Sequence, residues 1–220
     1  MKSHKYKAII FDFDGVISES VDVKTKAFSK IYSCYGKDIV EKVVSHHMSH
    51  GGMSRYKKFK YYHKEFLDRE LNKEDLINIS DKFSQLVLQK VIDAPYVPGA
   101  LNFIKNNYKK YKLFISTGTP QNEINEILLK KRMKKYFVSI YGSPADKTDH
   151  IEDIIKKTAY KKDEVIFIGD ADTDIVAAKI SNVRIILREH NESSYSQKYK
   201  NMTKVNDLNN LSSYFKKYYF

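Results

Sequence analysis

The chain has 220 residues, of which 42% are hydrophobic and 13% aromatic, which excludes wholesale disorder and supports a folded core. No apolar run approaches the roughly 20 residues that cross a bilayer, and the basic N-terminal stretch does not read as a signal peptide, so we expect a cytoplasmic protein with no membrane partner. A single cysteine, Cys34, excludes an internal disulfide and a cysteine-based zinc site. The net charge of +12 is compatible with a polyanionic partner, but the lysines are spread along the chain, which does not favour nucleic-acid binding.

Short apolar runs and amphipathic segments alternate along most of the chain. The segments at 122–132, 148–158 and 175–180 place their apolar residues on one face, as helices do. Alternation of this kind is typical of an α/β fold with a doubly wound parallel sheet. The predicted strands span residues 8–13, 112–116, 137–141, 165–168 and 183–187.

Residues 18–94 break the alternation, because they contain no convincing strand and favour several helices, for example at 25–35, 56–71 and 73–92. His46, His47 and His50 can share one helix face there, where a position on the surface or packing inside the helical segment is favoured over metal binding. Two prolines and a glycine in residues 95–99 indicate a return linker. We therefore predict a discontinuous α/β core of residues 1–17 and 95–220 with an inserted α-helical cap of residues 18–94.

Two acidic clusters follow predicted strands. Asp12 and Asp14 end the first strand, and their carboxylates would repel each other unless a cation or a proton intervened; two solvated aspartates in a turn are the alternative. Asp170, Asp172 and Asp174 follow a later strand and open a helix, where capping explains only one of them. Ligands bind at the carboxyl edge of such a sheet, and oxygen ligands suit Mg²⁺, so we expect a magnesium site there.

These two clusters resemble the motifs of the haloacid dehalogenase superfamily, in its phosphatase branch with a helical cap after the first strand. Phosphoglycolate phosphatases and beta-phosphoglucomutases are capped members of this kind. The motif Asp-x-Asp-Gly-Val/Thr is matched by Asp12-Phe13-Asp14-Gly15-Val16, and Gly-Asp-x-x-x-Asp by residues 169–174. The resemblance covers nearly the whole chain and implies a Rossmann-like core with an inserted cap.

The resemblance also implies roles for the acidic residues. Asp12 would attack phosphorus, and Asp14 would act as general acid and base. Mg²⁺ would be held by Asp12, Asp14 and Asp170, while Asp174 would be a further ligand or would orient a neighbouring group.

Two weaker motifs complete the set that the resemblance implies. Thr117 would bind the phosphoryl oxygens, with Ser116 as an alternative by one position and Gly118 as a further substrate contact. Lys147 would be the lysine that stabilises charge on the phosphoryl group.

We therefore expect a magnesium-dependent phosphatase that acts on a small phosphorylated metabolite through an aspartyl-phosphate. Asp14 favours phosphate ester chemistry over dehalogenation, but a sugar phosphomutase would keep the same residue. Residues 52–55 resemble a cap element of beta-phosphoglucomutase, in which Arg55 would bind a second anionic or hydroxyl-rich part of the substrate; an ordinary basic helix is the alternative. A nucleic-acid-binding protein or polynucleotide phosphatase is the remaining alternative, and the sequence does not indicate an oligomeric state.

Overall fold

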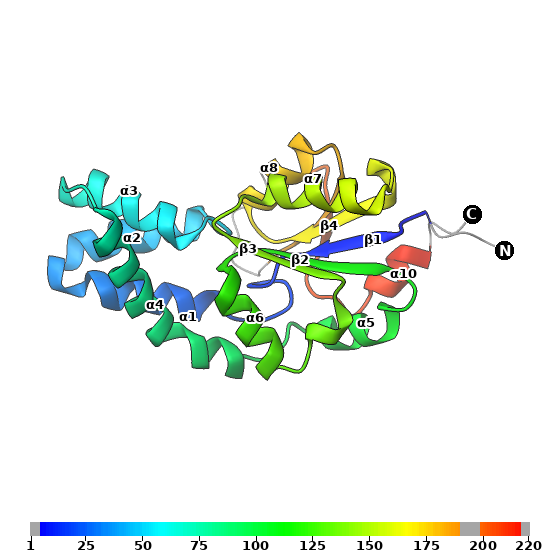
Figure 1. Ribbon diagram of the computed structural model, residues 1–220, viewed down its shortest axis with the longest axis horizontal. Coiled ribbons are helices and arrows are strands. Elements are labelled where there is room, and N and C mark those ends of the chain that lie inside the picture. Colours follow the sequence, from blue (N-terminus) through cyan, green and yellow to red (C-terminus); the bar gives the residue numbers. More distant parts are fainter. Residues whose placement is uncertain (1–4, 190–198, 217–220) are drawn as a thin grey trace.

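A six-stranded parallel sheet forms the centre of the computed structural model, which describes residues 5–189 and 199–216. The strand order is β3-β2-β1-β4-β5-β6 (Figure 1). The prediction of a doubly wound parallel sheet is confirmed, although β6 is not among the strands that the sequence predicts. The strands are β1 (Ala8–Phe11), β2 (Lys112–Pro120), β3 (Ser139–Ser143), β4 (Val165–Gly169), β5 (Arg184–Arg188) and β6 (Thr203–Val205).

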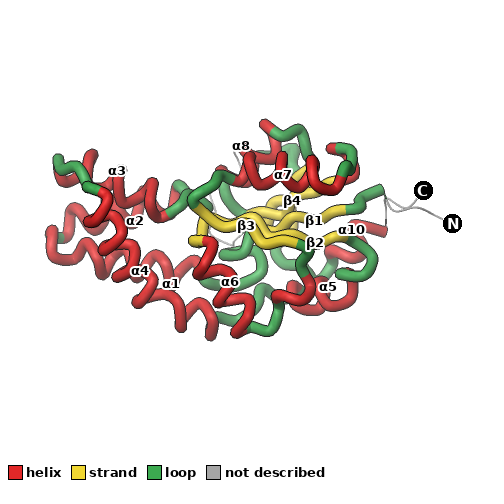
Figure 2. The backbone as a smooth tube through the Cα atoms, in the orientation of Figure 1, coloured by secondary structure: helices red, strands yellow, loops and turns green. Residues whose placement is uncertain are grey.

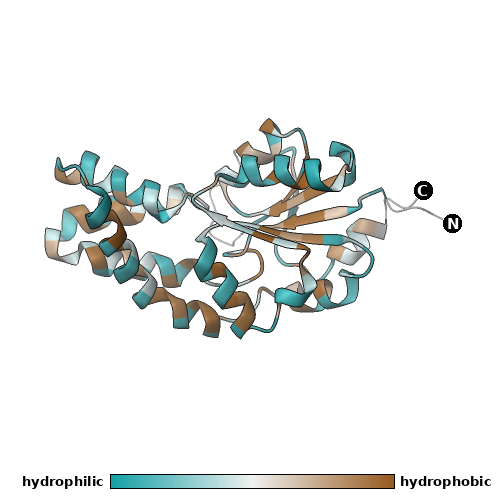
Figure 3. Ribbon diagram, viewed as in Figure 1, coloured by the Kyte–Doolittle hydropathy of each residue, from teal (hydrophilic) through white to brown (hydrophobic). Residues whose placement is uncertain are grey.

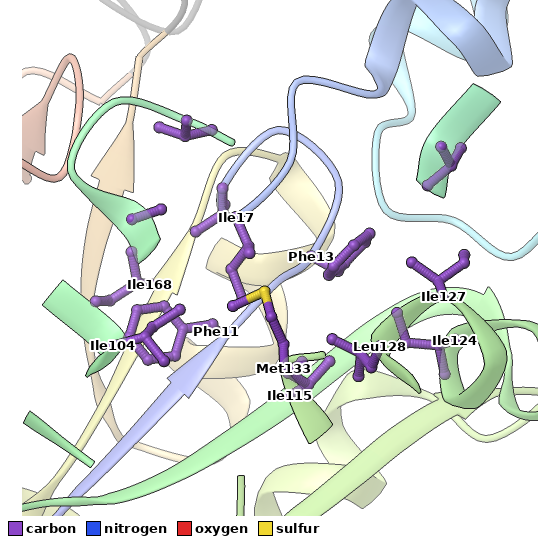
Figure 4. Close-up of a cluster of buried hydrophobic side chains, with 14 of the residues drawn as sticks. Phe11, Phe13, Ile17, Ile104, Ile115, Ile124, Ile127, Leu128, Met133 and Ile168 are labelled. Carbon is purple, nitrogen blue, oxygen red and sulfur yellow. The ribbon is translucent and has the colours of Figure 1, made fainter. Parts of the chain in front are cut away.

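Helices cover both faces of the sheet (Figures 1 and 2). Alternate side chains of a strand point to opposite faces, so Ile9 and Phe11 of β1 join one apolar cluster while Ala8 and Ile10 join another. Figure 4 shows Phe11 packed among side chains of the first cluster. The first cluster is covered by α5 (Ala100–Asn107), α6 (Gln121–Lys130) and α10 (Leu211–Lys216), and the second by α7 (Lys147–Thr158) and α8 (Asp172–Ile180).

Both faces of the central strands are therefore buried. All four residues of β1 are 0% exposed, which explains why the strand reads as a continuous apolar run rather than an alternating one. The hydropathy colouring in Figure 3 shows the apolar strands between helices whose outer faces are polar. Short 3₁₀ helices lie at η1 (Ser33–Tyr35), η2 (Lys134–Tyr136) and η3 (Lys162–Glu164). Among the described residues, no helix is both long and apolar enough to cross a membrane.

Four helices between β1 and α5 form a separate layer, at the left of Figure 1, which we call the cap. The two chain segments that lead into and out of it lie side by side, since Glu19 donates its backbone N–H to Pro95 at 2.9 Å and Val97 donates to Ile17 at 3.0 Å. The domain limits at 17/18 and 94/95 stay a prediction. The cap consists of α1 (Val21–Tyr32), α2 (Lys37–Ser49), α3 (Arg55–Leu67) and α4 (Lys73–Asp93).

The cap helices have their own apolar centre, in which the ring of Phe28 packs against those of Phe59 and Phe83 with centroids 5.5 and 4.5 Å apart. Helix α3 ends earlier than the predicted segment 56–71. Asp68 takes a left-handed conformation with φ of 50°, and the side chain of Asn72 caps the next helix by accepting the Asp75 N–H at 2.8 Å. These two local signals end α3 at Leu67 rather than at residue 71, and they begin α4 at Lys73, where the sequence predicts the next helix.

Candidate active site

Asp12, Lys147 and Asp174 meet at the carboxyl edge of the sheet. Asp12 follows β1, Lys147 is the first residue of α7, and Asp174 lies in the first turn of α8. The Lys147 ammonium lies 2.6 Å from Asp12 Oδ2 and 2.5 Å from Asp174 Oδ1. All three side chains are buried, so the lysine charge offsets two carboxylates away from water.

Burial and mutual charge set the protonation of this group. Burial raises the pKa of Asp12, and the nearby Asp174 carboxylate raises it further, whereas the Lys147 ammonium lowers it. The net result is a pKa of Asp12 above its ordinary value. Burial lowers the pKa of Lys147, but the two carboxylates outweigh burial and leave its pKa raised, so this lysine stays charged at neutral pH.

The acidic residues also meet the requirements of a hard cation. Oxygen atoms of Asp12, Asp170 and Asp174 lie within 4.8 Å of one another. Asp174 Oδ2 is fixed by the backbone N–H groups of Asp170 and Ala171, each at 3.1 Å. Carboxylate oxygens grouped in this way suit Mg²⁺, which takes one or two carboxylates and completes its shell with other oxygens. The donor set of Asp12, Asp170 and Asp174 therefore fits magnesium.

Asp14 has a different environment from Asp12. Its carboxylate pairs with the ammonium of Lys24 in α1 and accepts hydrogen bonds from Ser20 Oγ at 2.6 Å and Thr119 Oγ1 at 3.0 Å. Burial raises the pKa of Asp14, but Lys24 and these hydrogen bonds outweigh burial and leave its pKa below the ordinary value. The side chain of Asp14 thus faces the cap, and its predicted part in a metal site stays a prediction.

Lys24 is a residue of this site that sequence reasoning missed. Besides Asp14, its ammonium contacts Thr119 Oγ1 at 2.8 Å, which links the first cap helix to the end of β2. One lysine in a lysine-rich helix carries no signal of its own in the sequence, because its role depends on how α1 is placed over the sheet edge.

The end of β2 separates the two hydroxyl residues that sequence reasoning could not distinguish. Thr117 and Gly118 line the cavity beneath the cap. Ser116 is not among the lining residues, and its Oγ lies 2.8 Å from Nδ1 of the buried His150 in α7. The structure therefore places Thr117, and not Ser116, where a phosphoryl group could be held.

A cavity of about 790 Å³ lies between the sheet edge and the cap. Core residues at its floor include Asp12, Asp14, Thr117 and Asp170, and all four cap helices contribute side chains to its walls. A volume of this size matches the usual range of small-molecule sites.

The cap loop of residues 51–53 closes one side of this cavity. Thr173 Oγ1 donates to the Gly51 carbonyl at 2.9 Å, and Gly52 takes φ of +72°. A Cβ at Gly52 would lie 2.1 Å from Thr173 Oγ1 and 2.9 Å from Lys147 Nζ, and one at Gly118 would lie 2.4 Å from the Gly52 carbonyl oxygen. Glycine at positions 52 and 118 thus allows the cap loop to reach the carboxyl edge of the sheet.

Arg55 lies at the cavity wall but is already paired. Its guanidinium donates to Glu123 Oε1 of α6 at 2.5 Å and to Ser84 Oγ of α4 at 2.7 Å, and it lies over the Phe83 ring at 4.5 Å. Arg55 and Glu123 are both buried, so their charges compensate each other across the boundary between cap and core. This arginine therefore joins the two layers, and its predicted contact with a distal part of the substrate stays a prediction.

The family model for haloacid dehalogenase-like hydrolases matches residues 9–188, which include every element of the site described above. The chain belongs to the haloacid dehalogenase-like hydrolase family. The expected enzyme class, a hydrolase of phosphoric monoesters, is thereby confirmed at the level of the family.

Individual members of the family resemble the whole chain. It is 26% identical over 189 residues to a phosphorylated carbohydrates phosphatase of Thermotoga maritima, which covers 82% of this chain and 83% of that protein. A haloacid dehalogenase-like hydrolase from Streptococcus pneumoniae superposes with a TM-score of 0.73 at 19% identity, covering 96% of this chain and 99% of the other. A beta-phosphoglucomutase from Clostridium difficile superposes with a TM-score of 0.76 at 19% identity, covering 97% and 98%. The two structures establish the shared fold, in agreement with the predicted core.

Proposed function

We propose that this protein is a magnesium-dependent phosphatase that hydrolyses a small phosphorylated carbohydrate through an aspartyl-phosphate on Asp12. The observation that carries the proposal is the juxtaposition of Asp12 with Lys147, Asp170 and Asp174 at the floor of a cavity of small-molecule size. The named phosphatase of Thermotoga maritima supports a carbohydrate as the substrate.

The residues divide the chemistry in the following way. A carboxylate oxygen of Asp12 forms a bond to phosphorus as the ester P–O bond breaks, and Asp14 gives a proton to the leaving oxygen. Water then attacks phosphorus and gives a proton to Asp14, which releases inorganic phosphate and regenerates Asp12. Lys147 and the Thr117 hydroxyl donate to the phosphoryl oxygens as charge develops on them. Mg²⁺, held by Asp12 and Asp170, would supply positive charge that offsets the repulsion between carboxylate and phosphate.

Asp14 must change partners during this cycle. Its ion pair with Lys24 favours the ionised carboxylate, whereas protonating the leaving oxygen requires the acid form. The proposed acid step therefore includes the release of Asp14 from Lys24 toward the substrate.

The test is phosphate release from an aryl phosphate in the presence of magnesium. Asp12→Asn should abolish turnover, because an amide oxygen is a poor nucleophile, while circular dichroism shows an intact fold. Asp163→Asn, at an exposed position of η3 that precedes β4 and so lies at the opposite end of that strand from Asp170, is the matched control and should keep full activity. Turnover by Asp12→Asn comparable to that of the unaltered protein would remove Asp12 from the mechanism.

A sugar phosphomutase is the second candidate, favoured by the resemblance of residues 52–55 to a cap element of beta-phosphoglucomutase. Incubation with a hexose 1-phosphate and a bisphosphate activator separates the two activities. Isomerised sugar phosphate indicates a mutase, and inorganic phosphate indicates a phosphatase. A cavity of about 790 Å³ favours either small substrate over a polynucleotide.

A further inference from the structure

The cationic side chains that line the cavity differ in whether they have an acidic partner. Lys24 is paired with Asp14, and Arg55 is paired with Glu123. Lys58 of α3 also lines the cavity, but within residues 5–189 and 199–216 it forms no ion pair. Lys58 is therefore the lining cation whose charge the described part of the chain leaves uncompensated.

Lys58 is also almost fully buried. Its side chain is 2% exposed, and its ammonium lies 5.6 Å from the centroid of the Phe28 ring. Among the described residues its ammonium hydrogen-bonds with His47 alone, at 2.8 Å from Nδ1 and 3.3 Å from the backbone carbonyl. A buried ammonium without a carboxylate is costly, and natural proteins seldom keep one unless a partner binds there.

His47 offers a second unused donor beside it. Burial, aided by the Lys58 ammonium, lowers the pKa of His47 to about 2, so the ring is neutral at pH 7. Because Nδ1 accepts from the lysine, the ring proton is on Nε2, and this buried atom has no hydrogen-bond partner among the described residues. Lys58 and His47 thus form a pair of buried donors with unused capacity at the cap end of the cavity.

The surrounding charges make this end of the cavity attractive to anions. The lining residues between positions 45 and 83, which come from α2, α3, α4 and the cap loop, include no aspartate or glutamate. The acidic lining residues belong to the sheet edge and the entry to the cap, where Lys147, Lys24 and Arg188 already pair with three of them, Asp12, Asp14 and Glu19. Among the described residues that line the cavity, the cation without an acidic partner is thus Lys58, at the cap end.

We propose that Lys58 binds a second anionic group of the substrate, a carboxylate or a further phosphate, while the ester phosphate lies at Asp12. The substrate class is then a phosphorylated carbohydrate with an anionic group at its distal end. The sequence assigned such a role to Arg55, but Arg55 is neutralised by Glu123 and Lys58 is not. This inference rests on the proposed phosphatase function and adds the chemical class of its substrate.

Matched pairs of substrates test the proposal. A series of phosphorylated sugar acids, from phosphoglycolate to 6-phosphogluconate, is compared with the phosphorylated alcohols that carry a hydroxymethyl group in place of the carboxylate. The corresponding bisphosphates form the second arm. For at least one chain length, kcat/KM for the anionic ester should exceed that for its neutral partner by about tenfold or more, as expected for charge-assisted hydrogen bonds. The arm with the larger ratio identifies the anion as carboxylate or phosphate.

Variants assign the preference to Lys58. Lys58→Met should reduce the ratio of anionic to neutral ester to near one, and Lys58→Arg should restore part of it. Lys60→Met, at an exposed position of the same helix, is the matched control and should leave the ratio unchanged. Ratios near one at every chain length in the unaltered protein, or a ratio that Lys58→Met leaves in place, would overturn the proposal.

Failure of the proposed function gives a different result. In that case the protein hydrolyses neither the aryl phosphate nor any of the esters. Calorimetric titration with the same sugar acids and alcohols then measures their affinity for the proposed anion site without turnover. Tighter binding of the acids that Lys58→Met abolishes would support the site even then. Equal binding of acids and alcohols would refute it.

Discussion

Replacing Lys58 with methionine should remove part of the pH dependence of stability, because the buried ammonium is costly only while it is charged. Burial, aided by the positive charge of Lys24 and opposed by Asp14, lowers the pKa of Lys58 from 10.5 to about 7. In the unfolded chain the lysine binds its proton up to its ordinary pKa. The unfolded state thus holds more protons than the folded state between these two values, and the free energy of unfolding rises with pH in that window.

The expected size follows from the same two pKa values. The destabilising contribution of Lys58 is fully present below about pH 7 and is lost as the pH approaches 10.5. At about 1.4 kcal/mol per pH unit, with the full slope reached only above the folded-state pKa, the gain from pH 7 to pH 9 is roughly 2 kcal/mol. For a chain of this size, that corresponds to about 4 to 8 °C in Tm.

Thermal unfolding of the unaltered protein and of Lys58→Met, at intervals from pH 7 to pH 9, measures the difference. Titrations common to both proteins cancel, and His47 titrates far below this range. The Tm difference between the variant and the unaltered protein should shrink by several degrees as the pH rises. Lys60→Met should instead follow the unaltered protein throughout. Parallel curves for all three proteins would refute the conclusion that Lys58 is an uncompensated buried cation.

Three further outcomes follow from the site. Gly52→Ala should lower kcat/KM at least about tenfold, because the added Cβ would lie 2.1 Å from Thr173 Oγ1 and displace the cap loop from the carboxyl edge of the sheet. Tm should also fall, because alanine is strained at the φ of +72° that Gly52 adopts. Glu123→Ala should lower the free energy of unfolding by about 3 to 5 kcal/mol, because it leaves the Arg55 charge buried and unpaired. Replacing both Arg55 and Glu123 with methionine should recover most of this loss. If Glu123→Ala is as stable as the unaltered protein, the buried pair does not contribute as argued. Removal of divalent cations with a chelator should abolish phosphate release from an aryl phosphate, with recovery on adding Mg²⁺; turnover that persists in the chelator would contradict the proposed role of Asp12 and Asp170.

The sheet and the floor of the site could be predicted because each depends on signals within a few residues of sequence. Buried parallel strands are apolar on both faces, and ligand-binding residues follow them directly, so Asp12 and Asp170 could be placed at one edge from the strand pattern. Lys147 could be proposed from its position after a predicted strand, and the structure joins it to Asp12.

The contacts between cap and core could not be predicted in this way. Lys24 reaches Asp14 from the first cap helix, and Arg55 pairs with Glu123 across 68 residues of sequence, so both depend on how one layer is set upon the other. Periodicity defines which face of a helix is buried but not which element covers that face. The acidic residues at the edge of the sheet could therefore be predicted from the sequence, whereas the pairing of charges around the cavity could not.

Helix α3 nevertheless contains a signal that the run of basic residues conceals. Phe59 and Tyr62 are 0% exposed and define its buried face, and Arg55 and Lys58 occupy positions three or four residues away on that same face. Two cations on the apolar side of an amphipathic helix cannot both be solvated, so each requires a partner from another element. Glu123 meets this requirement for Arg55. For Lys58 the described chain provides only the neutral imidazole of His47, so an anionic group of a ligand would be the partner that neutralises its charge.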